Sequence, residues 1–378
     1  MNTRPPIESP SSTVVLSITF NDDCSCFAVG LNTGFCIYQA ETCSLKTARD
    51  FNAGVGLVQM MGKANYLGLV GGGRQPKFAA NKLILWDDQK SKSAMDISAL
   101  TPVRGVQLSK ERIVVVLQNS VRIFKFAKPP SLVAAYETAN NPWGLCCMSA
   151  RKIAFPGRMA GHIQLVEIAS GNVSIIPAHS SAIRAIQFSR DGDLLATASE
   201  TGTLIRVFAT DNCARVAELR RGIDPATIFS LAFSPAGTML ACTSDKFTLH
   251  VFNVPLPKRA AAEPADAGTS EGDDGKGKWG ILSKIPMMPR VFSDVYSFAS
   301  APFEAGEESL IGGLPISENT TLGTSRPPKG VLGWINGASL LVVGAGKDAR
   351  WEKFVIQDGP DGGRTIVREA WKRILGNN

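Results

Sequence analysis

Histidine is scarce in this chain of 378 residues, which contains only three. Acid–base chemistry would therefore fall to carboxylates, and no pair of Asp or Glu residues stands out along the sequence. The chain also lacks a phosphate-binding P-loop, a Gly-x-Ser-x-Gly nucleophile elbow and a cluster of metal ligands. These absences argue against an enzyme, and we expect neither a metal nor another cofactor.

Long apolar runs and metal-binding cysteine pairs are missing as well. No stretch is long enough to cross a bilayer as a helix, and the polar, proline-containing first dozen residues do not resemble a signal peptide. The eight cysteines are scattered through apolar runs without the two-residue gap that zinc ligands prefer. We expect reduced core cysteines in a cytoplasmic protein whose membrane contact, if any, is peripheral.

The charge balance is basic, with a net charge of +7. This excess indicates an anionic partner, which charge alone leaves open among nucleic acid, an anionic membrane and an acidic protein. The aromatic stacking arrays of known nucleic-acid modules are absent, so we expect no nucleic-acid partner.

Short β-rich runs that end in a bulky residue recur at intervals of roughly 38 to 48 residues. A period near 40–45 residues with several short strands per unit is typical of β-propeller blades. We predict an all-β, seven-bladed β-propeller that forms a single domain over residues 1–378, although the spacing also allows six or eight blades. The last blade is expected to be completed by pairing of the two chain ends. The recurring runs are 35–38, 83–86, 121–124, 163–166, 205–208, 249–252 and, after a long gap, 351–356.

Residues 255–326 interrupt the period and are predicted to be a partly disordered insertion in blade 6. The first part is of low complexity. Residues 278–292 then combine large apolar groups with Lys and Arg, and prolines argue against one continuous helix. This segment either covers the flank of the propeller or anchors it in a membrane interface, and we favour the anchor. The residues expected to enter the lipid are Trp279, Ile281, Leu282, Ile285, Met287, Met288 and Phe292.

Two adjacent arginines, Arg220 and Arg221, lie between two of the repeating units. In an extended segment their side chains must point to opposite faces, and Gly222 would let the backbone turn or approach a neighbour closely. Arginine suits bidentate phosphate contacts, so the pair predicts two anion sites side by side. Taken alone, such a motif is more often a surface pair that makes ordinary ion pairs, so the prediction depends on the residues on either side.

The units on either side of this pair carry similar polar residues. Ser199 and Thr203 are four residues apart before Arg206, and Ser244 and Thr248 are four apart before His250. Hydroxyl, imidazole and guanidinium groups all donate to phosphate oxygens. Ser and Thr at strand ends often only satisfy turns, but the repeated arrangement favours one polar pocket in each unit.

The sequence around Leu219-Arg220-Arg221-Gly222 resembles that of the PROPPINs, the seven-bladed phosphoinositide-binding propellers of autophagy. The hallmark of that family is the motif Phe/Leu-Arg-Arg-Gly. Residues 69–88 are similar to an early-blade motif of that family. Residues 279–298 are similar to its membrane loop in the sixth blade. The resemblance covers nearly the whole chain, and the Leu form of the motif places it closer to the shorter family members.

This resemblance implies two pockets for the headgroup of phosphatidylinositol 3-phosphate or phosphatidylinositol 3,5-bisphosphate, with no preference between them evident. It also implies peripheral attachment to preautophagosomal, endosomal or vacuolar membranes and recruitment of autophagy or endolysosomal partners. One such partner is the large lipid-transfer protein of autophagy, for which the region Gly71–Asp88 is the candidate surface. The first pocket would contain His179, Ser181, Thr197, Ser199, Thr203, Arg206 and Arg220. The second pocket would contain Arg221, Ser244, Thr248 and His250.

We expect a monomer in solution that uses both pockets at once, since two weak sites on one rigid scaffold bind a surface by avidity. The alternative is a WD-repeat interaction scaffold without a lipid ligand, which would bind a peptide at the mouth of its central channel. The position of the binding residues, on the rim or at the channel, distinguishes the two.

Overall fold

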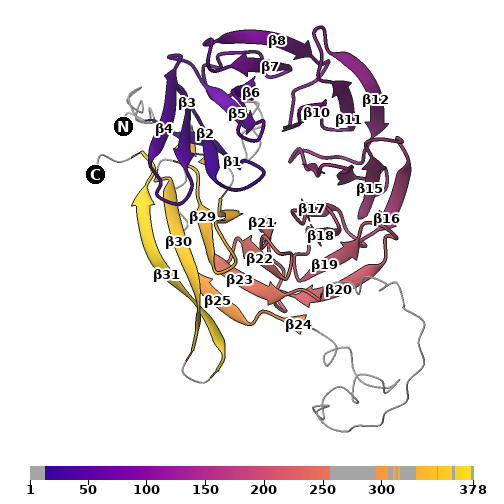
Figure 1. Ribbon diagram of the computed structural model, residues 1–378, viewed down its shortest axis with the longest axis vertical. Coiled ribbons are helices and arrows are strands. Elements are labelled where there is room, and N and C mark those ends of the chain that lie inside the picture. The colour runs from indigo at the N-terminus through magenta and orange to yellow at the C-terminus, as the bar shows by residue number, and fades with distance from the viewer. Residues whose placement is uncertain are drawn as a thin grey trace, which may run out of the picture.

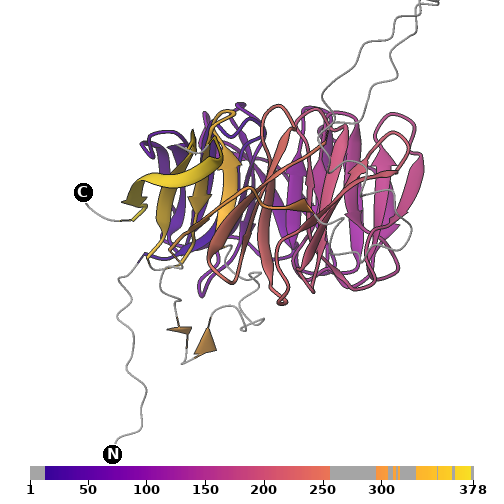
Figure 2. The ribbon, with the colours of Figure 1, turned by 90° about the horizontal axis from the view of Figure 1, so that it is seen from below.

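The computed structural model describes residues 13–255, 295–304, 310–311, 314–315, 329–346, 348–359 and 362–375. Within them, seven β-sheets of four or five strands each are arranged in a ring (Figure 1). Seen from the side, the ring is a disc whose strands run between its two faces (Figure 2). The predicted seven-bladed β-propeller is thereby confirmed, and we number the blades in chain order.

Blades 1 to 4 are each built from four consecutive strands that run from the inside of the ring to its rim. Blade 1 comprises β1 (Val15–Phe20), β2 (Cys26–Leu31), β3 (Gly34–Gln39) and β4 (Leu45–Asp50). Blade 2 comprises β5 (Val55–Met60), β6 (Tyr66–Gly71), β7 (Lys82–Asp87) and β8 (Lys92–Ser98). Blade 3 comprises β9 (Gly105–Leu108), β10 (Arg112–Val116), β11 (Ser120–Lys125) and β12 (Ser131–Glu137). Blade 4 comprises β13 (Cys147–Met148), β14 (Lys152–Pro156), β15 (His162–Glu167) and β16 (Val173–Pro177).

Blades 5 and 6 depart from this scheme at their rims, where β24 adds a fifth strand to blade 5 and β25 supplies the outer strand of blade 6. Blade 5 comprises β17 (Ile183–Phe188), β18 (Leu194–Ser199), β19 (Leu204–Ala209), β20 (Arg215–Arg220) and β24 (Val295–Tyr296). Blade 6 comprises β21 (Ile228–Phe233), β22 (Met239–Ser244), β23 (Thr248–Asn253) and β25 (Ala299–Pro302). Blade 7 comprises β28 (Val331–Trp334), β29 (Ser339–Val343), β30 (Arg350–Asp358) and β31 (Arg364–Arg373). A small separate hairpin comprises β26 (Leu310–Ile311) and β27 (Leu314–Pro315).

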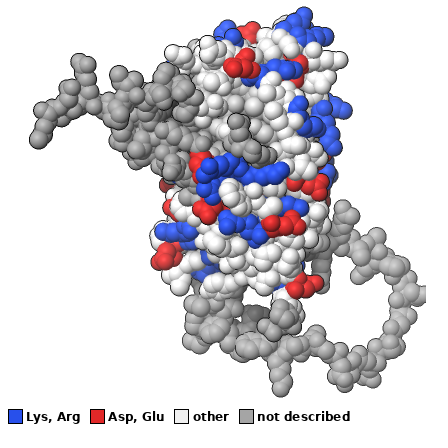
Figure 3. Space-filling model, turned by 90° about the vertical axis from the view of Figure 1, so that its left-hand side faces the viewer, with Lys and Arg blue, Asp and Glu red and all other residues white. Residues whose placement is uncertain are grey.

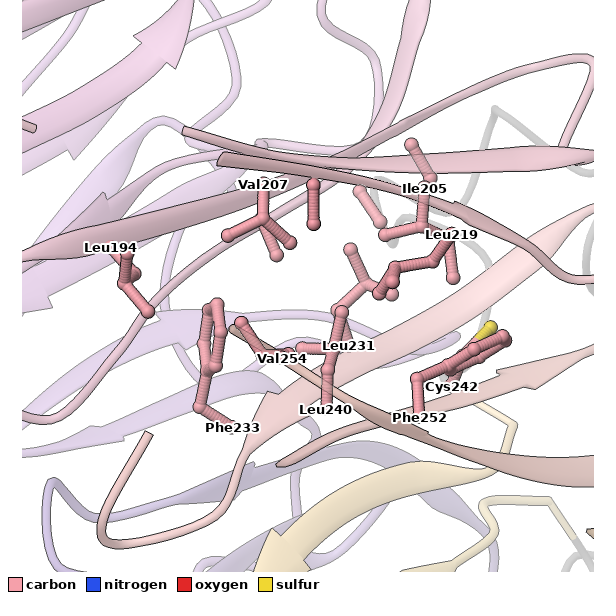
Figure 4. Close-up of a cluster of buried hydrophobic side chains, with 14 of the residues drawn as sticks. Leu194, Ile205, Val207, Leu219, Leu231, Phe233, Leu240, Cys242, Phe252 and Val254 are labelled. Carbon is pink, nitrogen blue, oxygen red and sulfur yellow. The ribbon is translucent and has the colours of Figure 1, made fainter. Parts of the chain in front are cut away.

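The hydrophobic core lies between neighbouring blades. The second strands β2, β18 and β22 are buried along their whole length because a blade packs against each of their faces. Between blades 5 and 6, Leu219, Phe233, Leu240 and Phe252 belong to one apolar cluster (Figure 4). Burial of each such large side chain contributes about 1.5–3 kcal/mol to the free energy of unfolding. The seams between blades are therefore rigid. A polar residue buried in one of them is unusual and points to a structural or functional role.

The ring closes differently from the sequence prediction. All four strands of blade 7 come from the C-terminal part of the chain, so the expected completion of this blade by both chain ends is wrong. The ten-residue strand β31 already supplies the outer edge, which leaves β1 free to be the inner strand of blade 1. The two blades meet through an antiparallel bridge between Val15 and Gly346 and through the Trp351 Nε1–H, which donates to the Ala40 carbonyl at 2.8 Å.

Part of the interval 255–326, which was predicted to be an insertion, belongs to the blades themselves. Strand β25 pairs with β23 within this interval and completes blade 6, since the chain returns to the rim of the sheet before it moves on to blade 7. The seven residues predicted to enter the lipid, Trp279 to Phe292, lie outside the described residues. The prediction of a membrane anchor therefore stays a prediction.

Candidate functional site

Arg220 and Arg221 lie where blade 5 meets blade 6 at the rim. Arg220 is the last residue of β20 and is paired with Leu204 on β19. The preceding Leu219 is fully buried in the cluster between blades 5 and 6, so Arg220 points to the other face, toward blade 4. Arg221 donates from Nε to the Gly202 carbonyl at 3.0 Å and lies close enough to His250 of blade 6 to lower its pKa. The two arginines therefore face different seams, as the sequence predicted.

Three polar residues form a row across blade 5 on the face toward blade 4. Thr197, Arg206 and Glu218 are directly opposite one another on β18, β19 and β20, so their side chains share one face. Thr197 is completely buried, and its hydroxyl donates to the Arg206 carbonyl at 3.3 Å. His179 reaches the same hydroxyl with its Nε2 at 3.0 Å. The structure thus brings together three residues of the predicted first pocket.

Arg206 also braces the seam between blades 4 and 5. Its Nε donates to Glu218 Oε2 at 2.7 Å and its Nη1 to the Ala178 carbonyl at 2.6 Å, just beyond β16. A residue at the same place in the third strand of blade 4, Gln164, donates to the Glu137 carbonyl at 2.8 Å. This recurrence indicates that Arg206 has a structural role in addition to any contact with an anion.

The pKa of His179 is lowered to about 4, chiefly because the imidazole is buried and also because the Arg206 guanidinium lies beside it. The ring is therefore neutral near pH 7. Since Nε2 contacts a hydroxyl that itself donates to the Arg206 carbonyl, Nε2 is the protonated nitrogen and Nδ1 is an acceptor in the free protein. A phosphate oxygen at Nδ1 would require a second proton on this ring.

The other predicted members of the first pocket differ in exposure. Ser181 and Thr201 join by a hydroxyl–hydroxyl hydrogen bond of 3.1 Å at the surface. Ser199 is buried at the end of β18. Thr203 precedes β19 and accepts the Arg221 N–H at its carbonyl, at 2.9 Å. Of these, Ser181 presents its hydroxyl at the edge of the pocket.

The second pocket lies on the face of blade 6 toward blade 5. His250 on β23 is opposite Cys242 on β22, which belongs to the apolar cluster of that seam. Burial and, secondarily, Arg221 lower the pKa of His250. Ser244 is completely buried at the end of β22, and Thr248 begins β23 with its hydroxyl donating to the Lys246 carbonyl at 3.2 Å.

The strand registers revise the match between the two pockets. Blade 5 pairs Ala198 with Ile205, and blade 6 pairs Thr243 with Leu249. Leu204, and not Thr203, therefore occupies the place of Thr248, because the turn before β19 is one residue longer. The equal four-residue spacings in the sequence hid this difference.

Two expectations about glycine and cysteine are refined by the structure. A Cβ at Gly222 would meet nothing within 4 Å, whereas Gly202 has a φ of +63° and its Cβ would lie 1.7 Å from the Ala226 carbonyl oxygen. The turn therefore needs its glycine at 202. All eight cysteines are free thiols, and burial raises the pKa of Cys242 to about 12. Such a thiol is not a nucleophile at neutral pH.

Three residues of the site were not found from the sequence. Glu218 is two residues before Arg220 on the same strand face, a spacing that could have revealed it. Thr201 lies within the turn that was examined for Ser199 and Thr203. Ser297, whose Oγ lies 3.1 Å from His250 Nδ1, is 47 residues away in sequence and gave no signal.

The candidate partner surface Gly71–Asp88 includes structural contacts. Asp88 forms a two-pronged ion pair with Arg49 of blade 1, at 2.9 and 3.1 Å, and accepts the Trp86 indole N–H at 3.2 Å. Lys77 lies over the Phe51 ring, 5.4 Å from its centroid. These contacts join blades 1 and 2.

The flank formed by β4, β30 and β31 shows cations and anions intermingled (Figure 3). Arg368 pairs with the buried Glu352 at 2.8 Å, and Lys353 pairs with Glu369 at 2.7 Å. Much of the positive charge on this flank is therefore compensated by neighbouring carboxylates. Across the described ranges, no group of three or more His, Cys, Asp or Glu residues could hold a metal ion. The same ranges contain no helix long and apolar enough to span a membrane.

The fold places the chain among the seven-bladed β-propellers, and comparisons with known proteins narrow the class. The PROPPIN family profile matches residues 14–303. "SVP1-like protein 2" of Neurospora crassa is 51% identical over 426 residues, covering 100% of this chain and 99% of that protein. The protein of the same name from Saccharomyces cerevisiae is 31% identical and covers 90% of this chain and 86% of its own length.

Solved structures agree on the fold. Kluyveromyces lactis Hsv2 with its complete loop 6CD has a TM-score of 0.75 at 24% identity and covers 96% of this chain and 100% of its own. KlAtg21 in complex with the coiled coil of AgAtg16 has a TM-score of 0.64 at 18% identity, covering 95% and 99%. The chain belongs to the PROPPIN family of phosphoinositide-binding β-propellers.

Proposed function

We propose that this protein binds phosphatidylinositol 3-phosphate and phosphatidylinositol 3,5-bisphosphate through two rim pockets, one on each side of Leu219-Arg220-Arg221-Gly222. The observation that carries the proposal is the division of the two arginines between neighbouring seams. Arg221 lies by His250 of blade 6, while Arg220 shares a strand face with Glu218 and Arg206, beside His179.

Each pocket would hold a phosphate by charge-assisted hydrogen bonds. Arg206, Arg220, His179 and Ser181 supply donors at the first pocket. The buried Thr197 and Ser199 and the nearby Thr203 shape it. Arg221 and His250 supply donors at the second, with Ser244 and Thr248 at its edge. Such bonds from an ionised donor to an anion are shorter and roughly twice as strong as neutral ones. Since both imidazoles are neutral in the free protein, a bound phosphate would raise their pKa and favour proton uptake.

Two pockets on one rigid rim would give avidity. Once the first headgroup is bound, the second is met at an effective concentration far above that in solution. Insertion of Trp279, Ile281, Leu282, Ile285, Met287, Met288 and Phe292 would add apolar burial at the interface. Nearby Lys and Arg would each add about 1 kcal/mol at an anionic surface. The protein would stand edge-on, with blades 5 and 6 toward the membrane.

The remaining blades would then be free for protein partners. KlAtg21 has been solved with the coiled coil of AgAtg16, which supports autophagy proteins as partners of this fold. We propose that this chain is a cytoplasmic, non-enzymatic monomer that attaches to preautophagosomal, endosomal or vacuolar membranes. The region Gly71–Asp88 would recruit a lipid-transfer protein.

Calorimetric titration with inositol 1,3-bisphosphate, the soluble headgroup of phosphatidylinositol 3-phosphate, tests the two pockets directly. The proposal predicts two binding events per chain, with Arg220→Thr and Arg221→Thr each removing one. Arg151→Thr serves as the control because this arginine is exposed and paired at 2.7 Å with Asp193, which directly precedes β18, whereas Thr197 and Ser199 of the first pocket lie toward the other end of that strand. A single event that survives both substitutions, or no binding at all, would contradict the proposal.

A further inference from the structure

A short segment crosses the outside of the seam between blades 5 and 6, and we call residues 295–302 the strap. Its first part, β24, pairs in parallel with β20, Leu219 opposite Val295 and Arg220 opposite Tyr296. Its last part, β25, pairs antiparallel with β23 of blade 6 (Figure 1). The strap is therefore hydrogen-bonded to the arginine motif at one end and to the strand that carries His250 at the other.

Ser297 lies between these two anchors, half-buried, with its Oγ 3.1 Å from Nδ1 of His250. The next residue is fixed as well, because the Phe298 N–H donates to the Val251 carbonyl at 3.0 Å. The Arg364 guanidinium lies over the Phe298 ring, 4.0 Å from its centroid. The hydroxyl of Ser297 is thus held at the imidazole by the backbone on both sides.

The imidazole itself is also constrained. The ring of Phe252, two residues along the same strand face and completely buried, is stacked beside that of His250, with centroids 6.3 Å apart and an interplanar angle of 28°. A neutral imidazole carries one N–H, and the hydrogen bond made by one ring nitrogen decides which nitrogen keeps the proton. When a serine O–H donates to Nδ1, the proton must be on Nε2.

We propose that Ser297 is a positioning residue of the second pocket, which donates to Nδ1 of His250 and so presents the Nε2–H to a phosphate oxygen. The inference rests on the proposed function, because that function supplies the phosphate that accepts the Nε2–H of His250. With the opposite tautomer, Nε2 would turn a lone pair toward the anion and repel it. The strap is then part of the pocket, supplied by the chain after it leaves and returns to blade 6.

Nitrogen-15 NMR of the histidine rings tests the tautomer without any ligand. The chain has only three histidines, so His162→Gln and His179→Gln assign the signals. We expect the Nε2–H form of His250 in the wild type and in Ser297→Thr, which keeps the hydroxyl, and a mixture of tautomers in Ser297→Ala. Ser174→Ala is the matched control, since this serine is exposed on the outer strand of blade 4.

Titration with inositol 1,3-bisphosphate in an Arg220→Thr background, in which the first pocket is expected to be lost, then measures the second pocket. Ser297→Ala should weaken binding about five-fold, the worth of one hydrogen bond, while Ser297→Thr and Ser174→Ala leave it unchanged. If the wild type binds and Ser297→Ala binds equally well, or if His250 carries its proton on Nδ1, the inference about Ser297 is overturned although the proposed function stands. If the unsubstituted protein binds no headgroup, the proposed function fails, whatever the tautomer.

Discussion

His179 and His250 each lie beside an arginine that, together with burial, lowers the imidazole pKa in the free protein. The same arginines are the groups expected to hold a phosphate, whose negative charge would offset their effect on the ring. His179, whose Nε2–H is already used by Thr197, is a conditional donor, because it gains its second N–H only when the anion is present. The pockets are thus built for a phosphate more than for a neutral ligand.

Headgroup affinity should therefore rise as the pH falls. The free His179 has a pKa of about 4, and a bound phosphate raises it, so binding takes up a proton at any pH between the two values. We expect tighter binding at about pH 5.5 than at about pH 7.5, the range in which a perturbed imidazole titrates. Calorimetry in buffers of different ionisation enthalpy would count the protons taken up.

His179→Gln provides the control for this prediction, since glutamine keeps a polar group but does not titrate. The variant should lose the pH dependence that belongs to the first pocket. An affinity that is the same at both pH values in the unsubstituted protein, with no proton uptake, would show that neither imidazole becomes charged on binding.

At the scale of the element, the turn between β18 and β19 holds both pockets in place. Gly202 adopts the left-handed region, and its carbonyl accepts from the Arg221 guanidinium. The adjacent Thr203 carbonyl accepts the Arg221 N–H. The position of the second arginine therefore depends on a backbone conformation that L side chains rarely adopt.

Gly202→Ala should consequently damage both stability and binding. The added Cβ would lie 1.7 Å from the Ala226 carbonyl oxygen, so the turn must move. We expect the free energy of unfolding to fall by more than about 1 kcal/mol and headgroup affinity at the second pocket to fall with it. Chemical denaturation and calorimetry measure the two effects. Gly222→Ala, which meets no atom within 4 Å, should change neither, and equal behaviour of the two variants would refute this account of the turn.

At the scale of the whole molecule, the period of the sequence predicted the architecture because each blade repeats the same short strands. It also placed the arginine pair between two units, and strand alternation then predicted that its members face different seams. These inferences rest on local rules, which the sequence carries directly.

The features that the sequence did not reveal depend on contacts between distant segments. The prediction of ring closure was wrong because the ten-residue strand β31, which forms the outer edge of blade 7, has no counterpart of that length in the other blades. Ser297 was missed because it is 47 residues away from His250 in the sequence. The place of Thr203 was misjudged because Ser199 and Thr203 have the same four-residue spacing as Ser244 and Thr248, although the turn in blade 5 is one residue longer. The hydrogen bonds that Arg206 and Gln164 donate to the neighbouring blade likewise become visible only when two blades are side by side.

Liposome flotation tests the central claim most directly, with plain vesicles and vesicles containing phosphatidylinositol 3-phosphate or 3,5-bisphosphate. The protein should float only with the phosphoinositides, and Arg220→Thr with Arg221→Thr should remain at the bottom. Arg151→Thr with Arg158→Thr removes the same charge from exposed sites on blade 4 and should float like the unsubstituted protein. If both double variants float alike on any anionic vesicle, net positive charge explains the binding and the two pockets do not.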